Sequence, residues 1–274
     1  MRENLSTAEI LRWQLDAGVD ETIGNEPLNH FAIKAVEKPP VPGPQPQTSA
    51  LAPPPLSLPS KPAQVSASAE KLLHDACAIA ASANTLEELN QALKDFDGCA
   101  LKKTATNLVF GDGDPKAKIV LIGEGPGAEE DRQGVPFVGP GGLLLNKMLA
   151  SIGLNREAVY VSNTVFWRPP GNRTPTPSEQ ALCLPFVERL MELIDPEILI
   201  TLGGPAAKLM LAQSAGIGRL RGKWYEYSTP RLSRPVQATV LFHPDSLISS
   251  PGQKRETWRD LLMIRDKLNM LPKN

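Results

Sequence analysis

Four short apolar runs alternate with amphipathic segments along the second half of the chain. The runs occupy residues 118–124, 158–164, 197–203 and 238–244. Segments with the apolar spacing of helices lie between or after them, at residues 142–153, 178–194, 204–216 and 257–271. Strands that are joined through helices run parallel and are covered on both faces. The alternation therefore predicts a three-layer α/β/α domain around a central, mainly four-stranded parallel sheet.

Polar side chains follow three of the four predicted strands. They are Glu124, Asn163 and His243. The carboxyl ends of parallel strands share one edge of the sheet, where loops and helix N-termini converge. We therefore expect a carboxylate, an amide and an imidazole to meet in one cleft. Taken singly, Asn163 also fits a turn, and His243 also fits a surface or capping residue.

The first of these strand ends is rich in glycine and reads GEGPG over residues 123–127. Dinucleotide-binding proteins carry a phosphate loop at this place, but the third glycine of the G-x-G-x-x-G pattern is missing here. Acidic side chains lie in or just after the loop, at Glu124, Glu129, Glu130 and Asp131. They would repel a bound pyrophosphate. A nucleotide-binding enzyme is therefore the disfavoured interpretation.

A proline-rich stretch precedes this domain. Residues 39–62 hold ten of the 27 prolines and almost no large apolar residue, which is typical of an extended or disordered linker. Ahead of it, residues 5–21 have the spacing of a short helix that either docks a partner or folds back on the body. We divide the chain into an acidic N-terminal segment (1–37), a linker (38–69) and a main domain (70–274). The main domain begins with two helical segments broken at Asn84-Thr85, where Thr85 and Glu88 have capping-box spacing.

Charge and cysteine content limit the class of protein. Residues 1–99 hold 7 Lys and Arg against 13 Asp and Glu, a balance of -6, whereas residues 100–274 hold 22 against 17, a balance of +5. This excess permits contact with phosphates, and a solvated mixed surface gives such numbers equally well. Three widely spaced cysteines argue against a disulfide framework and for a reducing compartment. Without a signal core or an apolar run of roughly 18 residues, we expect a cytoplasmic protein with no membrane span.

Four ordered motifs resemble one known family. They read GEGPGAEEDRQGVPFVGPGG, YVSNTVFWRPPGNRTP, LGGPAAKLM and FHPDSL, followed by a closing W-x-D-L. In order and spacing they resemble the family-4 uracil-DNA glycosylases from about residue 99 to about residue 268. The resemblance implies an enzyme that flips deoxyuridine out of DNA and hydrolyses its N-glycosidic bond, the first step of base excision repair. A uracil-DNA or abasic-DNA binding protein with slow turnover and product retention is the alternative.

The resemblance also implies roles for single residues. Asn163 resembles the amide that reads O4 and N3 of uracil, and Phe137 resembles the ring on which the base stacks. His243 resembles the donor to O2 of the departing base. Glu124 resembles the carboxylate that supports the cationic sugar and orients water, and Glu130 would close the pocket near C5 of the base.

Further positions follow from the same resemblance. The backbone at Gly125 and Gly127 would approach the flipped base and sugar. Leu247 and Ile248 resemble a wedge that fills the hole left by the base, or they simply begin a helix. The residues expected to contact DNA are Arg168, Asn172, Arg173, Arg221, Ser246, Leu247 and Ile248.

The motifs depart from the family at the metal site. Most relatives bind an iron-sulfur cluster through four cysteines, and here Phe96 and Trp167 replace two of them, while Cys99 and Cys183 remain. We therefore expect no cluster, with the aromatic pair filling its volume, and Cys77 as no substitute. We expect a monomer that acts on single- or double-stranded uracil-containing DNA. A protein partner for the N-terminal helix is a hypothesis.

Overall fold

The structure is a computed structural model that describes residues 67–270. The predicted N-terminal segment and nearly all of the predicted linker lie outside the described residues. The described part begins with a helix at Ala67, within the range that we assigned to the linker. All that follows concerns residues 67–270.

Six strands within the described range form one sheet in the order β1-β3-β2-β4-β6-β5. They are β1 (Asp112–Gly113), β2 (Ile119–Gly123), β3 (Tyr160–Asn163), β4 (Ile198–Leu202), β5 (Tyr225–Tyr227) and β6 (Val236–Leu241). The strands β3, β2, β4 and β6 pair in parallel, which confirms the predicted four-stranded core. The edge strands β1 and β5 pair antiparallel and escaped prediction, because they are only 2 and 3 residues long.

Helices connect the strands. The α-helices are α2 (Ala67–Ser82), α3 (Leu86–Asp95), α4 (Ala128–Gln133), α5 (Pro140–Ala150), α6 (Pro177–Ile194), α7 (Gly204–Met210), α8 (Ile217–Leu220), α9 (Pro244–Ser249) and α10 (Lys254–Asn269). Short 3-10 turns are η1 (Ala100–Lys103), η2 (Arg156–Ala158), η3 (Pro170–Asn172) and η4 (Pro251–Gln253). Within residues 67–270, none of the helices combines the length and the apolar composition that a bilayer-spanning segment requires.

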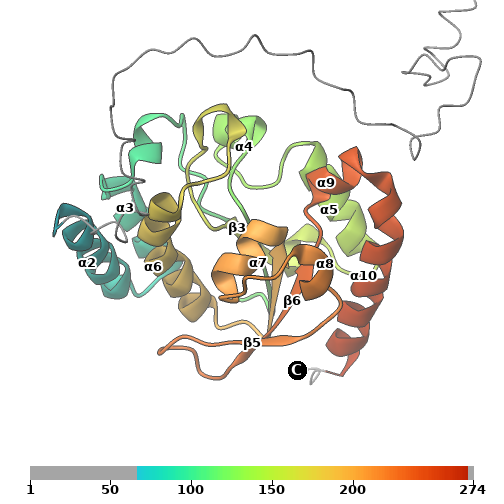
Figure 1. Ribbon diagram of the computed structural model, residues 1–274. Helices are drawn as coiled ribbons and strands as arrows, with labels where there is room; N and C mark the ends of the chain where they lie inside the picture. Colours follow the sequence, from blue (N-terminus) through green and yellow to red (C-terminus); the bar gives the residue numbers. More distant parts are fainter. Residues whose placement is uncertain (1–66, 271–274) are drawn as a thin grey trace, which may run out of the picture. The chain divides into compact units, whose positions relative to one another are not determined.

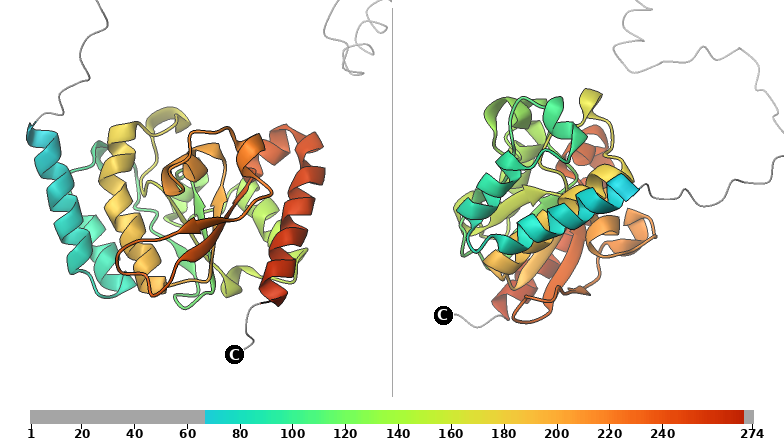
Figure 2. Two further views of the ribbon diagram at one scale, coloured as in Figure 1. Left: turned by 60° about the horizontal axis from the view of Figure 1, so that its bottom comes forward. Right: turned by 90° about the vertical axis from the view of Figure 1, so that its left-hand side faces the viewer.

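Alternate residues of β2 face opposite layers of helices. Val120 and Ile122 belong to a core that they share with α2, α3, α6 and α7. Ile119 and Leu121 belong to a second core, shared with α5, α9 and α10. Figures 1 and 2 show the sheet between these two groups of helices. Burial on both faces explains why the parallel strands are continuous apolar runs, and it confirms the predicted three layers.

The break between α2 and α3 falls at the predicted position. The hydroxyl of Thr85 accepts a hydrogen bond from the Glu88 N–H over 3.1 Å and caps α3. The Glu88 carboxylate accepts from the N–H of Asn84 (2.7 Å) instead of closing the reciprocal capping box on Thr85. A cap of this kind contributes about 1 kcal/mol to helix stability.

The chain path brings the functional strand ends to one edge. From β2 the chain passes to β3 on one side and then returns to β4 on the other, so the order of connection reverses at β2. In open parallel sheets, ligands bind beyond the carboxyl ends at such a reversal. Gly123 lies in register with Asn163, and Leu202 with Leu241, so the parallel strands end almost level.

Candidate active site

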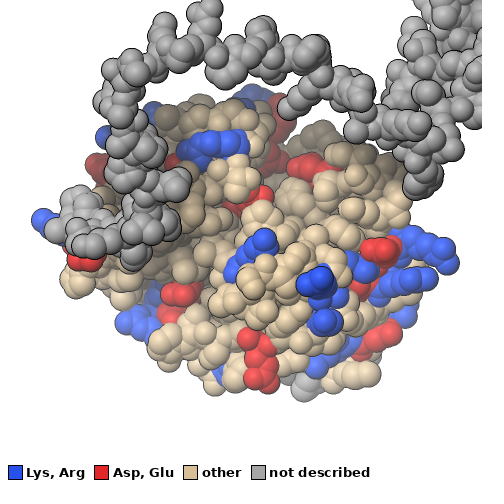
Figure 3. Space-filling view, viewed as in Figure 1, with Lys and Arg blue, Asp and Glu red and all other residues tan. Residues whose placement is uncertain are grey.

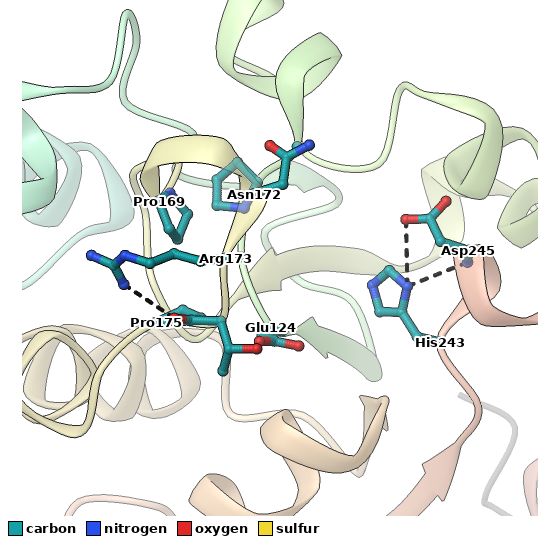
Figure 4. A pocket seen from close by; sticks show the side chains of 11 residues that line it. Glu124, Pro169, Asn172, Arg173, Pro175, His243 and Asp245 are labelled. Carbon is teal, nitrogen blue, oxygen red and sulfur yellow. Dashed lines mark hydrogen bonds and ion pairs between the residues drawn. The ribbon is translucent and has the colours of Figure 1, made fainter.

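A cleft of about 270 Å³ opens at this edge of the sheet (Figure 4). A smaller cavity adjoins it and shares Gly125, His243 and Asp245 with it. The residues that matter below in the cleft are Glu124, Gly125, Gly127, Asn172, Arg173, His243 and Asp245. Those in the smaller cavity, called the inner cavity here, are Gly125, Glu130, Phe137, Gly142, Asn163, His243 and Asp245. The carboxylate, the amide and the imidazole that follow the strands thus line two adjoining hollows.

Asn163 lies at the end of β3 and faces the inner cavity. Its side chain is 1% exposed, and neither its amide nitrogen nor its amide oxygen has a hydrogen-bond partner within residues 67–270. A buried polar group without a partner costs about 1–3 kcal/mol. Native structures rarely retain such a group unless it binds a ligand, a water molecule or an ion. The planar head of Asn163 therefore presents a donor and an acceptor to a ligand in the inner cavity.

Gly123 makes room for this amide. A Cβ atom at this position would lie 2.5 Å from Oδ1 of Asn163 and 2.5 Å from Cζ of Phe137. Both distances are far below van der Waals contact, so any larger residue would displace the amide, the ring or both. Gly123 at the end of β2 therefore allows the Asn163 and Phe137 side chains to pack close to the backbone. This role differs from that of a glycine in a phosphate-binding loop.

Phe137 adopts an unusual backbone conformation beside the amide. Its φ is 54°, in the left-handed region, which costs a bulky residue of the order of 1–3 kcal/mol. The ring is buried, and its centroid lies 5.7 Å from that of His243. A Cβ at Gly142 would lie 1.8 Å from the Phe137 carbonyl oxygen, so this turn requires glycine there. The strained turn places the aromatic ring in the lining of the inner cavity.

Glu130 holds the Phe137 turn against the glycine loop. Its carboxylate accepts hydrogen bonds from the N–H groups of Val138 (3.0 Å), Gly139 (2.9 Å) and Gly127 (3.1 Å). Glu130 therefore lines the inner cavity, but its oxygens bind backbone donors. The structure supports a positioning role for this residue, and its predicted contact near C5 of a base stays a prediction.

Two of the four acidic residues near the loop bind other parts of the protein and do not line the hollows. Glu129 pairs with Arg132 over 2.7 Å at the surface. The Asp131 carboxylate is buried and accepts from the N–H groups of Thr106 (2.8 Å) and Asn107 (3.0 Å). Only Glu124 and Glu130 of this set line the hollows.

His243 is the N-cap of α9. Its Nδ1 accepts a hydrogen bond from the Asp245 N–H over 3.3 Å, and the Asp245 carboxylate lies 3.5 Å from the same nitrogen (Figure 4). Burial lowers the pKa of His243, while the nearby carboxylates of Asp245, Glu124 and Glu130 oppose this shift. In the neutral ring the hydrogen is therefore on Nε2. Sequence reasoning missed Asp245, although an acid in the first turn after a capping histidine is a visible signal.

The family model of the uracil DNA glycosylase superfamily matches residues 110–262, more than half of the chain. The chain belongs to the uracil-DNA glycosylase superfamily. It is 39% identical over 184 residues to a type-4 uracil-DNA glycosylase of Archaeoglobus fulgidus, covering 66% of this chain and 92% of that protein. The type-4 enzyme of Thermotoga maritima is 38% identical over 164 residues, 60% of this chain and 83% of its own length. The type-4 enzyme of Pyrobaculum aerophilum is 35% identical over 183 residues, which cover 65% of this chain and 92% of that protein.

The comparisons contradict our prediction that this superfamily member lacks an iron-sulfur cluster. Its relatives are type-4 uracil-DNA glycosylases, and proteins of this type are iron-sulfur proteins. The predicted absence of a cluster is therefore withdrawn. Aromatic residues at two of the four ligand positions were too little ground for it.

The four positions that correspond to cluster ligands hold only two sulfur donors, Cys99 and Cys183. Cys99 and Cys183 are buried, and their mutual hydrogen bond, together with burial, raises the pKa of the Cys183 thiol. Phe96 and Trp167 lie in the same core cluster and bring rings instead of sulfurs, while Cys77 is exposed. Within residues 67–270, no group of three or more His, Cys, Asp or Glu could hold a metal. Two sulfurs are half of a cluster's donor set, so these residues do not by themselves fit one, and no chemical step below is routed through it.

The predicted DNA contacts of this superfamily member differ in how free their side chains are. Arg168 donates to the Asn172 amide oxygen (2.6 Å), and both are near the cleft. Arg173 forms two hydrogen bonds with Glu179 (2.9 and 2.7 Å), which lower the pKa of Glu179 to about 2. Arg221 pairs with Asp260 over 2.8 Å. Of these three arginines, only Arg168 lacks a carboxylate partner within residues 67–270. Arg173 and Arg221 would have to break their ion pairs with Glu179 and Asp260 before they could bind phosphates.

The predicted wedge divides into one buried and one exposed residue. Leu247 is 1% exposed and belongs to the core beneath α9, whereas Ile248 is 46% exposed. The Ser246 hydroxyl donates to the His243 carbonyl (2.7 Å) and closes the first turn of α9. Of the predicted pair, only Ile248 has the exposure that insertion between bases requires.

Proposed function

We propose that this chain hydrolyses the N-glycosidic bond of deoxyuridine in DNA, releasing uracil and leaving an abasic site. Its membership of the superfamily and its similarity to type-4 uracil-DNA glycosylases support this activity. The observation that carries the proposal is that the buried amide of Asn163, beside Phe137 and His243, has no hydrogen-bond partner within residues 67–270. Uracil offers an acceptor at O4 and a donor at N3, which match the two amide atoms. Cytosine offers the opposite pattern and leaves both unsatisfied when the amide keeps the orientation that matches uracil.

The depth of the inner cavity supports base flipping. Asn163 is almost fully buried and the Phe137 ring is 8% exposed, so a base stacked within a duplex cannot reach them. The nucleotide must leave the stack, which costs a few kcal/mol. Contact with the Phe137 ring and with the Asn163 amide would offset that cost.

His243 would act on the departing base. As the bond between C1′ and N1 breaks, its electron pair leaves with uracil, and negative charge gathers at O2. The hydrogen on Nε2 of His243 is held by the contacts at Nδ1 and can stabilise this charge. A fixed donor in a site poor in water typically contributes about a hundredfold or more to the rate.

Glu124 would act on the sugar. It lines the cleft beside the inner cavity, where the deoxyribose of a flipped nucleotide would lie. The sugar becomes cationic as the base departs, and a carboxylate stabilises that charge. The same carboxylate orients a water molecule, whose oxygen forms the new bond to C1′ while its proton passes to Glu124.

The remaining assignments are proposals of the same kind. The catalytic domain would span residues 70–274 and act as a monomer on single- or double-stranded DNA. Arg168 and Asn172 would contact the backbone beside the cleft. The three free cysteines support action in a reducing compartment such as the cytoplasm.

The test is excision from an oligonucleotide with one deoxyuridine, followed by alkaline cleavage of the abasic site. Wild-type protein should produce strand scission with uracil and none with cytosine at the same position. Asn163→Ala and His243→Ala serve as controls. Absence of scission by folded wild-type protein would refute the proposed activity.

A further inference from the structure

An apolar groove lies between α5, α9 and α10, and it shares no lining residue with the cleft or the inner cavity. Its volume is about 210 Å³. Met148, Leu247 and Leu261 form a buried floor, and Leu144 adds to it. Trp258 stands at its side with 45% of its surface exposed. We call this feature the α5–α10 groove. The exposed tryptophan beside a buried aliphatic floor offers apolar surface that a ligand could cover.

The charged residues that line the α5–α10 groove are all cationic. Lys147 lies on α5 and Lys254 at the start of α10, and among residues 67–270 no acidic residue lines the groove. Neither lysine has a carboxylate partner within residues 67–270, and the same holds for the exposed Arg259 that follows Trp258 in the sequence. The nearby exposed acid Glu256 pairs with Arg221 over 3.2 Å and does not line the groove. In the view of Figure 3, Lys and Arg side chains lie interspersed with Asp and Glu side chains on the side of the domain where α10 lies.

The polar groups of the α5–α10 groove have internal partners. The Thr257 hydroxyl donates to the Gln253 carbonyl (3.0 Å), and the Ser151 hydroxyl donates to the Met148 carbonyl (2.6 Å). The groove therefore offers a ligand apolar contact in its centre and positive charge at its side, with little demand for neutral hydrogen-bonding groups. A chain that alternates aliphatic or aromatic residues with carboxylates has this complementary pattern.

We infer that the α5–α10 groove binds a short acidic segment of a partner protein. Apolar side chains of the segment would fill the floor against Trp258, a residue type that often dominates binding energy. Its carboxylates would pair with Lys147 and Lys254. Nucleic acid fits less well, because its phosphates would meet the lysines but leave the Leu and Met floor without apolar side chains to cover it.

Occupation of the groove would leave the cleft open. Leu247 of α9 contributes to the groove floor, while His243 at the start of the same helix lines the cleft. The two hollows have different lining residues, so a bound peptide would not fill the space of a flipped nucleotide. The partner would thus hold this protein while the cleft and the inner cavity stay open to a flipped nucleotide.

The test uses the full chain and a fluorescein-labelled synthetic peptide in which glutamates alternate with leucines. Fluorescence anisotropy should show binding that weakens with salt. Trp258→Ala should weaken it by about tenfold or more, and Lys147→Glu with Lys254→Glu by at least as much. Leu143→Ala, an exposed apolar change outside the groove, and Lys71→Glu, a distant charge reversal on α2, should leave it unchanged. Thermal unfolding of each variant separates lost binding from lost folding.

The other outcomes contradict the inference. No binding of the peptide to folded wild-type protein would overturn it, as would equal binding of a peptide with lysines in place of the glutamates. Weaker binding of a uracil-free oligonucleotide to the Trp258→Ala variant, with no peptide binding, would assign the groove to nucleic acid. A concentration-dependent dimer that Trp258→Ala dissociates would assign it to a second copy of this chain.

Discussion

The Asp245 backbone N–H and the Asp245 carboxylate both face Nδ1 of His243, at 3.3 and 3.5 Å. The N–H can donate only to a ring nitrogen without hydrogen, which is the neutral state of the ring. The carboxylate can accept the hydrogen that Nδ1 gains when the ring is protonated. In both charge states Nε2 keeps its hydrogen, so the donor toward the cleft is retained.

Asp245→Asn should lower the pKa of His243 further. Burial already holds this pKa below its usual value of about 6.5, and the Asp245 carboxylate is the largest opposing influence, ahead of Glu124 and Glu130. An NMR titration of the imidazole measures the shift. Asp266→Asn on α10 is the matched control, and an unchanged His243 midpoint in the Asp245 variant would count against the coupling.

The same histidine predicts a pH dependence of stability. Its folded-state pKa lies below its unfolded value, so the unfolded chain binds more protons in the interval between them. The contribution of His243 to stability is therefore complete above about pH 6.5 and is lost as the pH falls through the folded-state pKa. Urea unfolding at a series of pH values should show a smaller decline in His243→Gln than in the wild type.

Gly123→Ala should impair both folding and excision. The added Cβ would overlap Oδ1 of Asn163 and the Phe137 ring, each 2.5 Å away. Overpacking of this kind costs about 1–3 kcal/mol, and displacement of the amide should lower the excision rate by about tenfold or more. Gly252→Ala is the control, since a Cβ there meets no atom within 4 Å. Equal behaviour of the two variants would show that Gly123 does not fix the amide.

Leu247 and Ile248 should respond differently to replacement by alanine. Leu247 is buried, so Leu247→Ala should lower the free energy of unfolding by about 2–5 kcal/mol. Ile248→Ala should change stability by less than about 0.5 kcal/mol, because Ile248 is exposed. If Ile248 fills the gap left by a flipped base, its loss should slow excision from duplex more than from single-stranded DNA. Equal effects on the two substrates would remove Ile248 as a wedge.

We predict that Arg221 stabilises the fold and that its replacement mainly affects stability, not DNA binding. Its guanidinium pairs with the buried Asp260 carboxylate (2.8 Å) and with Glu256 (3.2 Å). Arg221→Ala would leave the Asp260 charge uncompensated and should destabilise the protein by about 3 kcal/mol. Adding Asp260→Asn should restore part of that loss. A normal melting temperature for Arg221→Ala, with a reduced salt dependence of DNA binding, would favour the phosphate contact instead.

The sequence predicted the sheet because burial on both faces makes each parallel strand a continuous apolar run. It predicted that Glu124, Asn163 and His243 approach one edge, because parallel strands end together. The local sequence contains no sign of the left-handed turn at Phe137, which depends on Gly142 and on Glu130. Nor could it predict that Arg221 pairs with Asp260, since that contact joins residues 39 positions apart in sequence.

The buried amide of Asn163 has no hydrogen-bond partner within residues 67–270, and we propose that uracil supplies it. Asn163→Ala removes two unsatisfied polar atoms, so the variant should unfold at the same or a higher urea concentration than the wild type. Its rate of uracil excision from a single-deoxyuridine oligonucleotide should fall by about a hundredfold or more. Measuring both quantities on one preparation tests this role of Asn163. A stable Asn163→Ala protein that excises uracil at the wild-type rate would contradict it.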